Sequence, residues 1–174
     1  RGSLFFDIVA VLKAVQPKYF ILENVRRILT VDNKQTIDRI MKVITLDLGY
    51  NADYCTLNSS DYGVPQVRRR VFFCGARKDT KLTTSITLPA FKGKPIIKKD
   101  PVRKVLEKKT DDKYWLSEKI LKTILSDGTG GYYQKSEIDR PVARPLTKTM
   151  HKMHRAHQDN YYSENYITGK KKSN

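Results

Sequence analysis

Long apolar runs are missing from this sequence. A membrane-spanning helix needs about 20 consecutive apolar residues, whereas the longest apolar stretch here is the short run around Tyr19–Leu22. Arg1-Gly2-Ser3 leads directly into an amphipathic segment, which is unlike a cleavable secretory signal. We therefore expect neither membrane insertion nor secretion.

Cysteine is scarce, with only Cys55 and Cys74 in 174 residues. Two cysteines without a secretory signal indicate reduced, cytosolic thiols and argue against a disulfide scaffold. Each follows an aromatic residue within a β-prone run, not in the exposed loop that a reactive thiolate needs. We expect both to be core residues.

Acidic residues are few compared with basic ones: 18 Asp and Glu against 34 Lys and Arg, a formal charge of +16. A surplus of this size predicts a polyanionic partner, because neutralised phosphates release their condensed counterions. The alternative is a solvated basic surface or a charged tail without a specific partner.

Helical periodicity alternates with short β-prone runs in the first half of the chain. The proline after Gln16 disfavours continuation of the first helix, and Gly49 ends the second. The expected elements are, in order, a helix Leu4–Val15, a strand Lys18–Leu22, a helix Ile37–Leu48, a strand Asn51–Leu57, a turn-rich segment Asn58–Gln66 and a strand Val71–Ala76. This order predicts an α/β fold, one flank of a layered sheet.

The second half has a different character. Residues 91–113 are rich in lysine and weakly periodic, and a short helix is expected over Ser117–Leu125. A glycine-rich turn follows at Asp127–Gly131, and the basic end, Gly169–Asn174, is expected to be frayed.

Three sequence blocks occur in a telling order: Arg-Gly-Ser-Leu-Phe-Phe-Asp-Ile at residues 1–8, Leu-Glu-Asn-Val at 22–25, and Asp-Tyr-Gly-Val-Pro-Gln-Val-Arg-Arg-Arg-Val-Phe-Phe at 61–73. Together they resemble the middle-to-late motifs of the DNA cytosine-C5 methyltransferases of bacterial restriction-modification systems. The resemblance covers residues 1–90 firmly and 130–168 loosely. It implies an α/β fold: the trailing part of a Rossmann-like methyltransferase sheet domain over 1–90, and a small irregular target-recognition region over 91–174.

The resemblance also implies a chemistry. Members of the family add a cysteine thiolate to C6 of a flipped cytosine, and C5 then attacks the methyl group of S-adenosylmethionine. Negative charge develops on ring N3 and O2 and must be stabilised. Glu23, on a strand-end platform, would contact N3 and the exocyclic amine, and Asn24 would orient it and cap the following turn. The alternatives are that Glu23 is an ordinary acidic residue at the start of a helix and that Asn24 is a plain capping residue.

Arg70 would reach the O2 side of the cytosine, and Arg68 a phosphate or the catalytic loop. Because alternate residues of a strand face the same side, we expect Arg68 and Arg70 to point together and Arg69 to point away. A guanidinium suits carbonyl and phosphate oxygens better than an ammonium does. Gln66 completes this motif and is a candidate DNA contact. A solvated basic edge strand is the alternative.

For the cofactor, S-adenosylmethionine, only Leu4 is implied as a pocket residue, on its adenine side; periodicity alone makes it a core leucine. The nucleophilic Pro-Cys pair and the glycine-rich cofactor loop of the family lie upstream of Arg1, and its closing Gly-Asn-Ser segment is absent. We therefore expect the chain to be inactive alone and to need a complementing N-terminal half.

DNA reading is expected from the stretch that begins at Arg140. The candidate contacts, cations and hydroxyls that suit phosphates or base edges, are Thr147, Lys148, Lys152, Arg155 and, less centrally, Asn160. A basic loop without specificity is the alternative. His151, His154 and His157 are evenly spaced, but no cysteine lies near and the spacing matches no familiar zinc pattern, so we expect no metal.

Two other functions remain open. One is an RNA (tRNA) cytosine-C5 methyltransferase, whose relatives share Glu-Asn-Val; the other is a non-catalytic DNA-binding remnant. The expected partner is duplex DNA, and the expected setting is the cytoplasm of a bacterium, or of one infected by a phage that encodes the chain.

Overall fold

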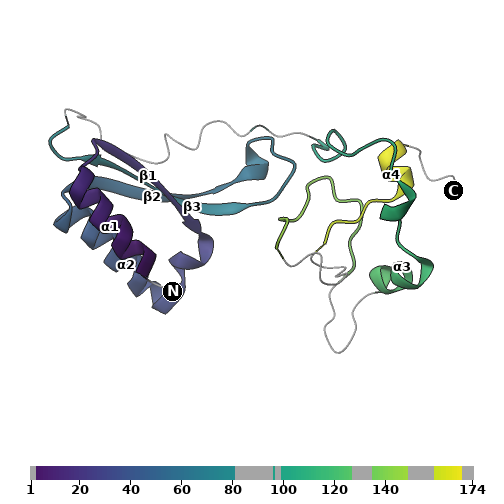
Figure 1. The fold of residues 1–174 in the computed structure, drawn as a ribbon, viewed down its shortest axis with the longest axis horizontal. Coiled ribbons are helices and arrows are strands. Elements are labelled where there is room, and N and C mark those ends of the chain that lie inside the picture. The colour runs from purple at the N-terminus through teal and green to yellow at the C-terminus, as the bar shows by residue number, and fades with distance from the viewer. Residues whose placement is uncertain (1–2, 81–95, 97–98, 127–134, 149–158, 170–174) are drawn as a thin grey trace. The chain divides into compact units, whose positions relative to one another are not determined.

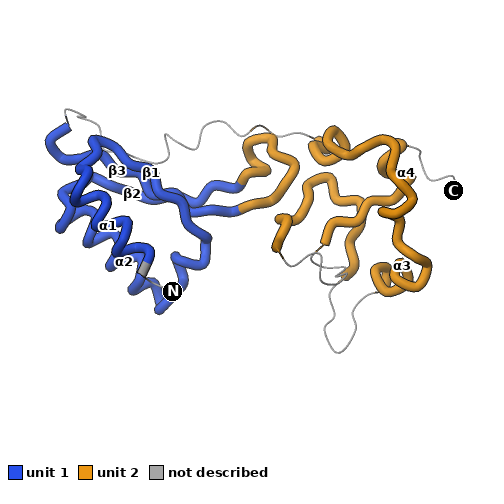
Figure 2. The backbone as a smooth tube through the Cα atoms, viewed as in Figure 1, with its two compact units in different colours: residues 1–58, 69–95 blue, residues 59–68, 96–174 orange. Residues whose placement is uncertain are grey.

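The computed structural model describes residues 3–80, 96, 99–126, 135–148 and 159–169. The chain divides into two compact units (Figures 1 and 2). Unit 1 comprises residues 1–58 and 69–95, and unit 2 comprises residues 59–68 and 96–174. The loop between the second and third strands therefore belongs to unit 2, a grouping that the sequence did not indicate.

Unit 1 is built on a three-stranded antiparallel sheet with the order β1-β3-β2. The strands are β1 (Tyr19–Val25), β2 (Tyr50–Asn58) and β3 (Arg69–Arg77). The last strand in sequence lies in the middle, so among the described residues β1 and β2 are the edges of this sheet. Its register places Glu23 opposite Phe72 and Val25 opposite Arg70.

Two helices, α1 (Ser3–Val15) and α2 (Gln35–Lys42), lie on the same side of the sheet (Figure 1). A π-helical turn, Val43–Asp47, continues α2, and Gly49, with a positive φ of 71°, starts the turn into β2. The core between helices and sheet is apolar and buried; it consists of Leu12, Phe20, Ile37, Ile40, Ile44, Tyr50, Val71 and Phe73. The mixed helix and strand composition expected from the sequence is confirmed.

The orientation of α1 differs from the expected stripe. Phe5, Ile8 and Leu12 pack toward the core, whereas Leu4, Val11 and Val15 are 72%, 58% and 66% exposed. Apolar residues surround most of this helix, so periodicity could not decide which face the sheet covers.

The other face of the sheet carries a second buried cluster, which contains both cysteines. Cys55 and Cys74 are both buried free thiols, as the sequence predicted, and Leu57 packs against them. Burial raises the pKa of the Cys74 thiol, with smaller contributions from Cys55 and Asp53. A thiol shifted in this direction is less reactive at neutral pH.

Gly75 lies directly opposite Phe20 in the sheet, and a Cβ atom at residue 75 would overlap the Phe20 ring. We expect Gly75→Ala to destabilise the fold by about 1–3 kcal/mol, the usual cost of overpacking a core. Chemical denaturation with Gly75→Ala, Phe20→Leu and the double variant measures the coupling. Equal costs of Gly75→Ala in both backgrounds would show that the ring is not the obstacle.

The described part of unit 2 has little regular structure. Its described α-helices are α3 (Glu118–Leu125), close to the expected helix, and α4 (Glu164–Thr168), which Ser163 caps by accepting a hydrogen bond from Tyr166 N. Val102 and Ile124 are its most buried apolar side chains. The expected turn at Asp127–Gly131 and the tail from residue 170 lie outside the described residues. Among the described helices, none has the length and apolar character needed to cross a membrane.

Candidate active site

Glu23 lies within β1, not beyond its end. The strand is longer than expected and runs through Val25, so the carboxylate projects from the sheet itself. Alternation along β1 places Phe20 and Leu22 on the helix side, in the core, and therefore Glu23 on the opposite face. On β3 the same rule places Val71 and Phe73 toward the helices and Arg70 on the face of Glu23.

Glu23 and Arg70 form an ion pair. Glu23 is opposite Phe72, two residues from Arg70, so the two side chains are diagonal neighbours within reach of each other. Arg70 Nε lies 2.7 Å from Glu23 Oε1. Arg70 also donates from Nη1 to the carbonyl oxygen of Arg69 at 2.9 Å, which fixes its guanidinium further.

The pair is accessible to a ligand from outside. The Glu23 side chain is 48% exposed and that of Arg70 22%. The acceptor oxygens of Glu23 and the donor N–H groups of Arg70 therefore lie next to each other on an exposed face of the sheet. A flat heterocycle with an adjacent donor and acceptor could bridge them, because a carboxylate only accepts and a guanidinium only donates.

Arg68 does not extend the pair in the expected way. The strand β3 begins at Arg69, so Arg68 precedes it and strand alternation does not relate Arg68 to Arg70. Its carbonyl oxygen accepts from Ser59 N at 3.1 Å, which closes the loop Ser59–Arg68. The sequence argument placed Arg68 inside the strand, whereas the strand begins one residue later; the role of Arg68 in the site remains a prediction.

Asn24 follows Glu23 on β1, and its role in orienting Glu23 remains a prediction. Its Oδ1 accepts a hydrogen bond from Val25 N at 2.8 Å, and adjacent strand residues point to opposite faces. Nor does Asn24 cap the short 3-10 helix Arg26–Leu29, whose N-cap is Val25. The structure therefore supports a local backbone role for this side chain.

Two cations beside the site were not singled out from the sequence. Arg26 and Arg27 open the 3-10 helix that follows β1, and both are exposed. The available signal was their position immediately after Glu-Asn-Val, at the end of the strand that carries the candidate acid. They add positive charge near a surface that would meet a polyanion.

Gln66 is half-buried in the loop Ser59–Arg68 of unit 2. Its carbonyl oxygen accepts from Ser59 Oγ at 2.6 Å, and its backbone pairs with Ala143. Thr147 and Lys148 are exposed, as DNA contacts would be. Their role as DNA contacts remains a prediction.

The other DNA-reading candidates, Lys152 and Arg155, and the histidines 151, 154 and 157 lie outside the described residues. Within the described ranges, no group of three or more His, Cys, Asp or Glu side chains is arranged to hold a metal ion.

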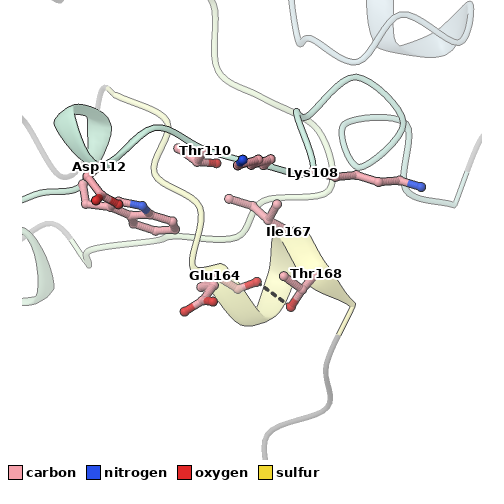
Figure 3. Close-up of a pocket in the computed structure, with 8 residues that line it drawn as sticks. Lys108, Thr110, Asp112, Glu164, Ile167 and Thr168 are labelled. Atoms are coloured by element: carbon pink, nitrogen blue, oxygen red, sulfur yellow. Dashed lines mark hydrogen bonds between the residues drawn. The ribbon is translucent and has the colours of Figure 1, made fainter.

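Unit 2 also contains two hollows next to Trp115. The larger, about 780 Å³, is lined mainly by apolar and aromatic side chains, including Tyr114, Leu121 and Tyr161. The smaller, about 380 Å³, is shown in Figure 3, where Glu164 and Thr168 of α4 stand near Thr110 and Lys108. The positive and negative charges in its lining are equal in number, from Lys108, Lys109, Asp112 and Glu164. Neither hollow shows a preference for an anionic ligand.

The fold resembles that of a solved methyltransferase. The solved structure of the S. pombe Dnmt2 methyltransferase matches with a TM-score of 0.62 at 21% sequence identity, and the match covers 90% of this chain and 47% of that one. This likeness supports a Rossmann-like methyltransferase architecture for the sheet and its helices.

The chain belongs to the C-5 cytosine-specific DNA methylase family, whose model matches residues 1–174. The type II methyltransferase M.NlaIV of Neisseria lactamica is 44% identical over 103 residues, 56% of this chain and 24% of that protein. M1.ScrFI of Lactococcus lactis subsp. cremoris is 34% identical over 121 residues, 69% of this chain and 30% of that protein. The predicted relationship to restriction-modification methyltransferases is confirmed, and the chain spans less than a third of these relatives' length.

Proposed function

We propose that this chain is the part of a DNA cytosine-C5 methyltransferase that stabilises the activated cytosine and reads the target DNA. The observation that carries the proposal is the 2.7 Å contact between Arg70 and Glu23 on an open sheet face, within motifs typical of the family. S-adenosylmethionine supplies the methyl group in this reaction. From this chain only Leu4, an apolar side chain 72% exposed on α1, is proposed to contact it.

In the proposed complex a flipped cytosine inserts at the ion pair. Glu23 binds N3 and the exocyclic amine, where it can hold or supply a proton as charge builds on the ring. Arg70 donates to O2. Both partners are already oriented by the sheet, so little reorganisation is needed when the charge develops. Asn24 and Arg68 remain proposed members of this site, Asn24 through the local backbone and Arg68 toward a phosphate.

The nucleophile is proposed to come from a further methyltransferase portion, in the same polypeptide or a separate one. An obvious contact region exists in unit 1, where β1 is a sheet edge and Ile21 is 67% exposed. The exposed stripe of Leu4, Val11 and Val15 on α1 adds further apolar surface. Burial of such a stripe stabilises association, because exposed apolar area leaves water.

The function is tested with a completed enzyme, meaning this chain joined to the preceding portion of M.NlaIV. We expect transfer of a labelled methyl group from S-adenosylmethionine to C5 of cytosine in duplex DNA. Transfer to tRNA in place of DNA would establish the RNA activity, and binding of DNA without any transfer would support the non-catalytic alternative. This chain alone is expected to transfer no methyl groups.

DNA binding by the chain alone is expected to depend steeply on salt. With a charge of +16 and about 6–10 phosphate contacts, affinity should fall by about 10³–10⁵ between about 50 and 200 mM salt. Fluorescence anisotropy with a labelled duplex measures this, and a protein of similar size but balanced charge serves as the control. A flat salt dependence would contradict phosphate contacts as the source of affinity.

A further inference from the structure

Asn160 uses both ends of its side-chain amide on the backbone of one residue, 16 positions away in the sequence. Its Oδ1 accepts a hydrogen bond from Arg144 N at 2.7 Å, and its Nδ2 donates to Arg144 O at 3.0 Å. Both bonds are partly buried. The amide thus mimics a neighbouring strand, and this internal role differs from the phosphate or base contact expected from the sequence.

Arg144 is held from its other end as well. Its guanidinium donates to the carbonyl oxygens of Glu137 and Asp159, each at 3.3 Å, and to the Glu137 carboxylate at 3.2 Å. The side chain is only 16% exposed. Burial lowers the pKa of Arg144, and the charge of Arg140 lowers it further. An arginine engaged in this way is part of the framework of unit 2.

Ala143, the residue before Arg144, is hydrogen-bonded to the loop Ser59–Arg68, which we call the motif loop. Ala143 N donates to Pro65 O and Ala143 O accepts from Val67 N, both at 2.9 Å. These two bonds fix the backbone of Gln66, which lies between Pro65 and Val67. From there the chain continues through Arg68 into β3. All of these contacts lie within unit 2. Hydrogen bonds join Asn160 to Arg144, the peptide chain joins Arg144 to Ala143, and hydrogen bonds join Ala143 to the loop Ser59–Arg68.

We propose that Asn160 is a positioning residue: by fixing Arg144 it holds Ala143 in register with Pro65–Val67, and so sets the loop that leads to the candidate catalytic arginine. The catalytic consequence of this proposal rests on the proposed function. The structural link from Asn160 to the loop Ser59–Arg68 does not depend on it. A rigid loop matters because misplacement of a positioning group by about 1 Å is enough to lower a rate by about 10²-fold.

Amide hydrogen exchange of this chain, followed by NMR, tests the link. In Asn160→Ala we expect exchange of the Val67 and Ala143 amides to accelerate about tenfold, because the support of Arg144 is lost. Asn160→Asp keeps the acceptor for Arg144 N but not the donor to Arg144 O, so its effect should be smaller. The matched control is Asn165→Ala, an exposed position of α4 that should leave both amides unchanged.

The Leu121 amide, hydrogen-bonded to the carbonyl oxygen of the N-cap residue Ser117, reports on α3, a separate element of unit 2. It should keep its rate in Asn160→Ala. Equal acceleration at Leu121 would show that Asn160 merely stabilises the unit, and no acceleration at Val67 and Ala143 would remove the link; either result overturns the proposal.

The completed enzyme gives the second measurement. Asn160→Ala should lower kcat about tenfold or more while leaving KM for S-adenosylmethionine unchanged, with Asn160→Asp recovering part of the loss. An unchanged kcat together with faster loop exchange would overturn the catalytic part of the proposal. Absence of methyl transfer in the unsubstituted enzyme would count against the proposed function and leave the exchange result standing.

Discussion

Replacing Glu23 by glutamine in the completed enzyme is expected to reduce the single-turnover rate of methyl transfer by about 100-fold or more. Glutamine is nearly the same size, but its amide cannot transfer a proton to ring N3 as a carboxyl group can, so the negative charge that develops on the ring is left uncompensated. Rapid-quench measurement of transfer to a short duplex at saturating DNA gives the rate of the chemical step. DNA affinity should change little, since one half-exposed carboxylate is lost.

Loss of folding does not account for such an effect. An exposed ion pair such as Glu23–Arg70 contributes about 1 kcal/mol or less to stability, so Glu23→Gln should unfold at nearly the same denaturant concentration. Asp47→Asn, which removes an exposed acid elsewhere in unit 1, is the matched control and should retain full activity. Near-normal turnover of Glu23→Gln would take Glu23 out of the mechanism.

Arg70→Met is expected to lower the same rate by about 100- to 1,000-fold, the range seen when one oriented donor to a developing oxyanion is removed. Methionine keeps much of the apolar stem, so packing against the sheet changes less than with alanine. Arg70→Lys should recover part of the rate, because it restores charge without the planar fork. The measurement is again single-turnover transfer at saturating DNA.

Arg69→Met provides the neighbouring control. Arg69 is exposed, lies next to Arg70 on β3 and projects to the opposite face of the strand. Removing its charge tests whether any loss reflects general weakening of DNA binding. If Arg69→Met and Arg70→Met lowered the saturated rate equally, the specific role of Arg70 would be untenable.

Much of the element order of unit 1 could be predicted from the sequence. Helical spacing from Leu4 onward, the β-prone run after Pro17 and the stop at Gly49 depend on local geometry, and the structure has the corresponding elements. Strand ends were less predictable. Whether β1 includes Glu23 and β3 begins at Arg69 depends on which partner strands continue the hydrogen-bonded ladder.

Only part of the candidate site could be predicted from the sequence. The motif order pointed to Glu23 and Arg70 together, and the structure brings them to 2.7 Å. Arg68 and Asn24 were implied by the same resemblance, but the start of β3 at Arg69 and the bond from Val25 N to Asn24 Oδ1 could not be read from the sequence. The internal role of Asn160 could not be predicted, and the sequence suggested a DNA contact in its place, because its hydrogen-bond partner is 16 residues away.

The sequence by itself determined the family, the charge and the helical or extended character of most segments of unit 1, because these depend on composition and on spacing along the chain. Only the tertiary structure decided which face of α1 is covered, that the motif loop packs with Ala143 of unit 2, and that a glutamate and an arginine 47 positions apart share one sheet face. The physical reason is strand order: β3 inserts between β1 and β2, and this antiparallel pairing turns distant positions into diagonal neighbours.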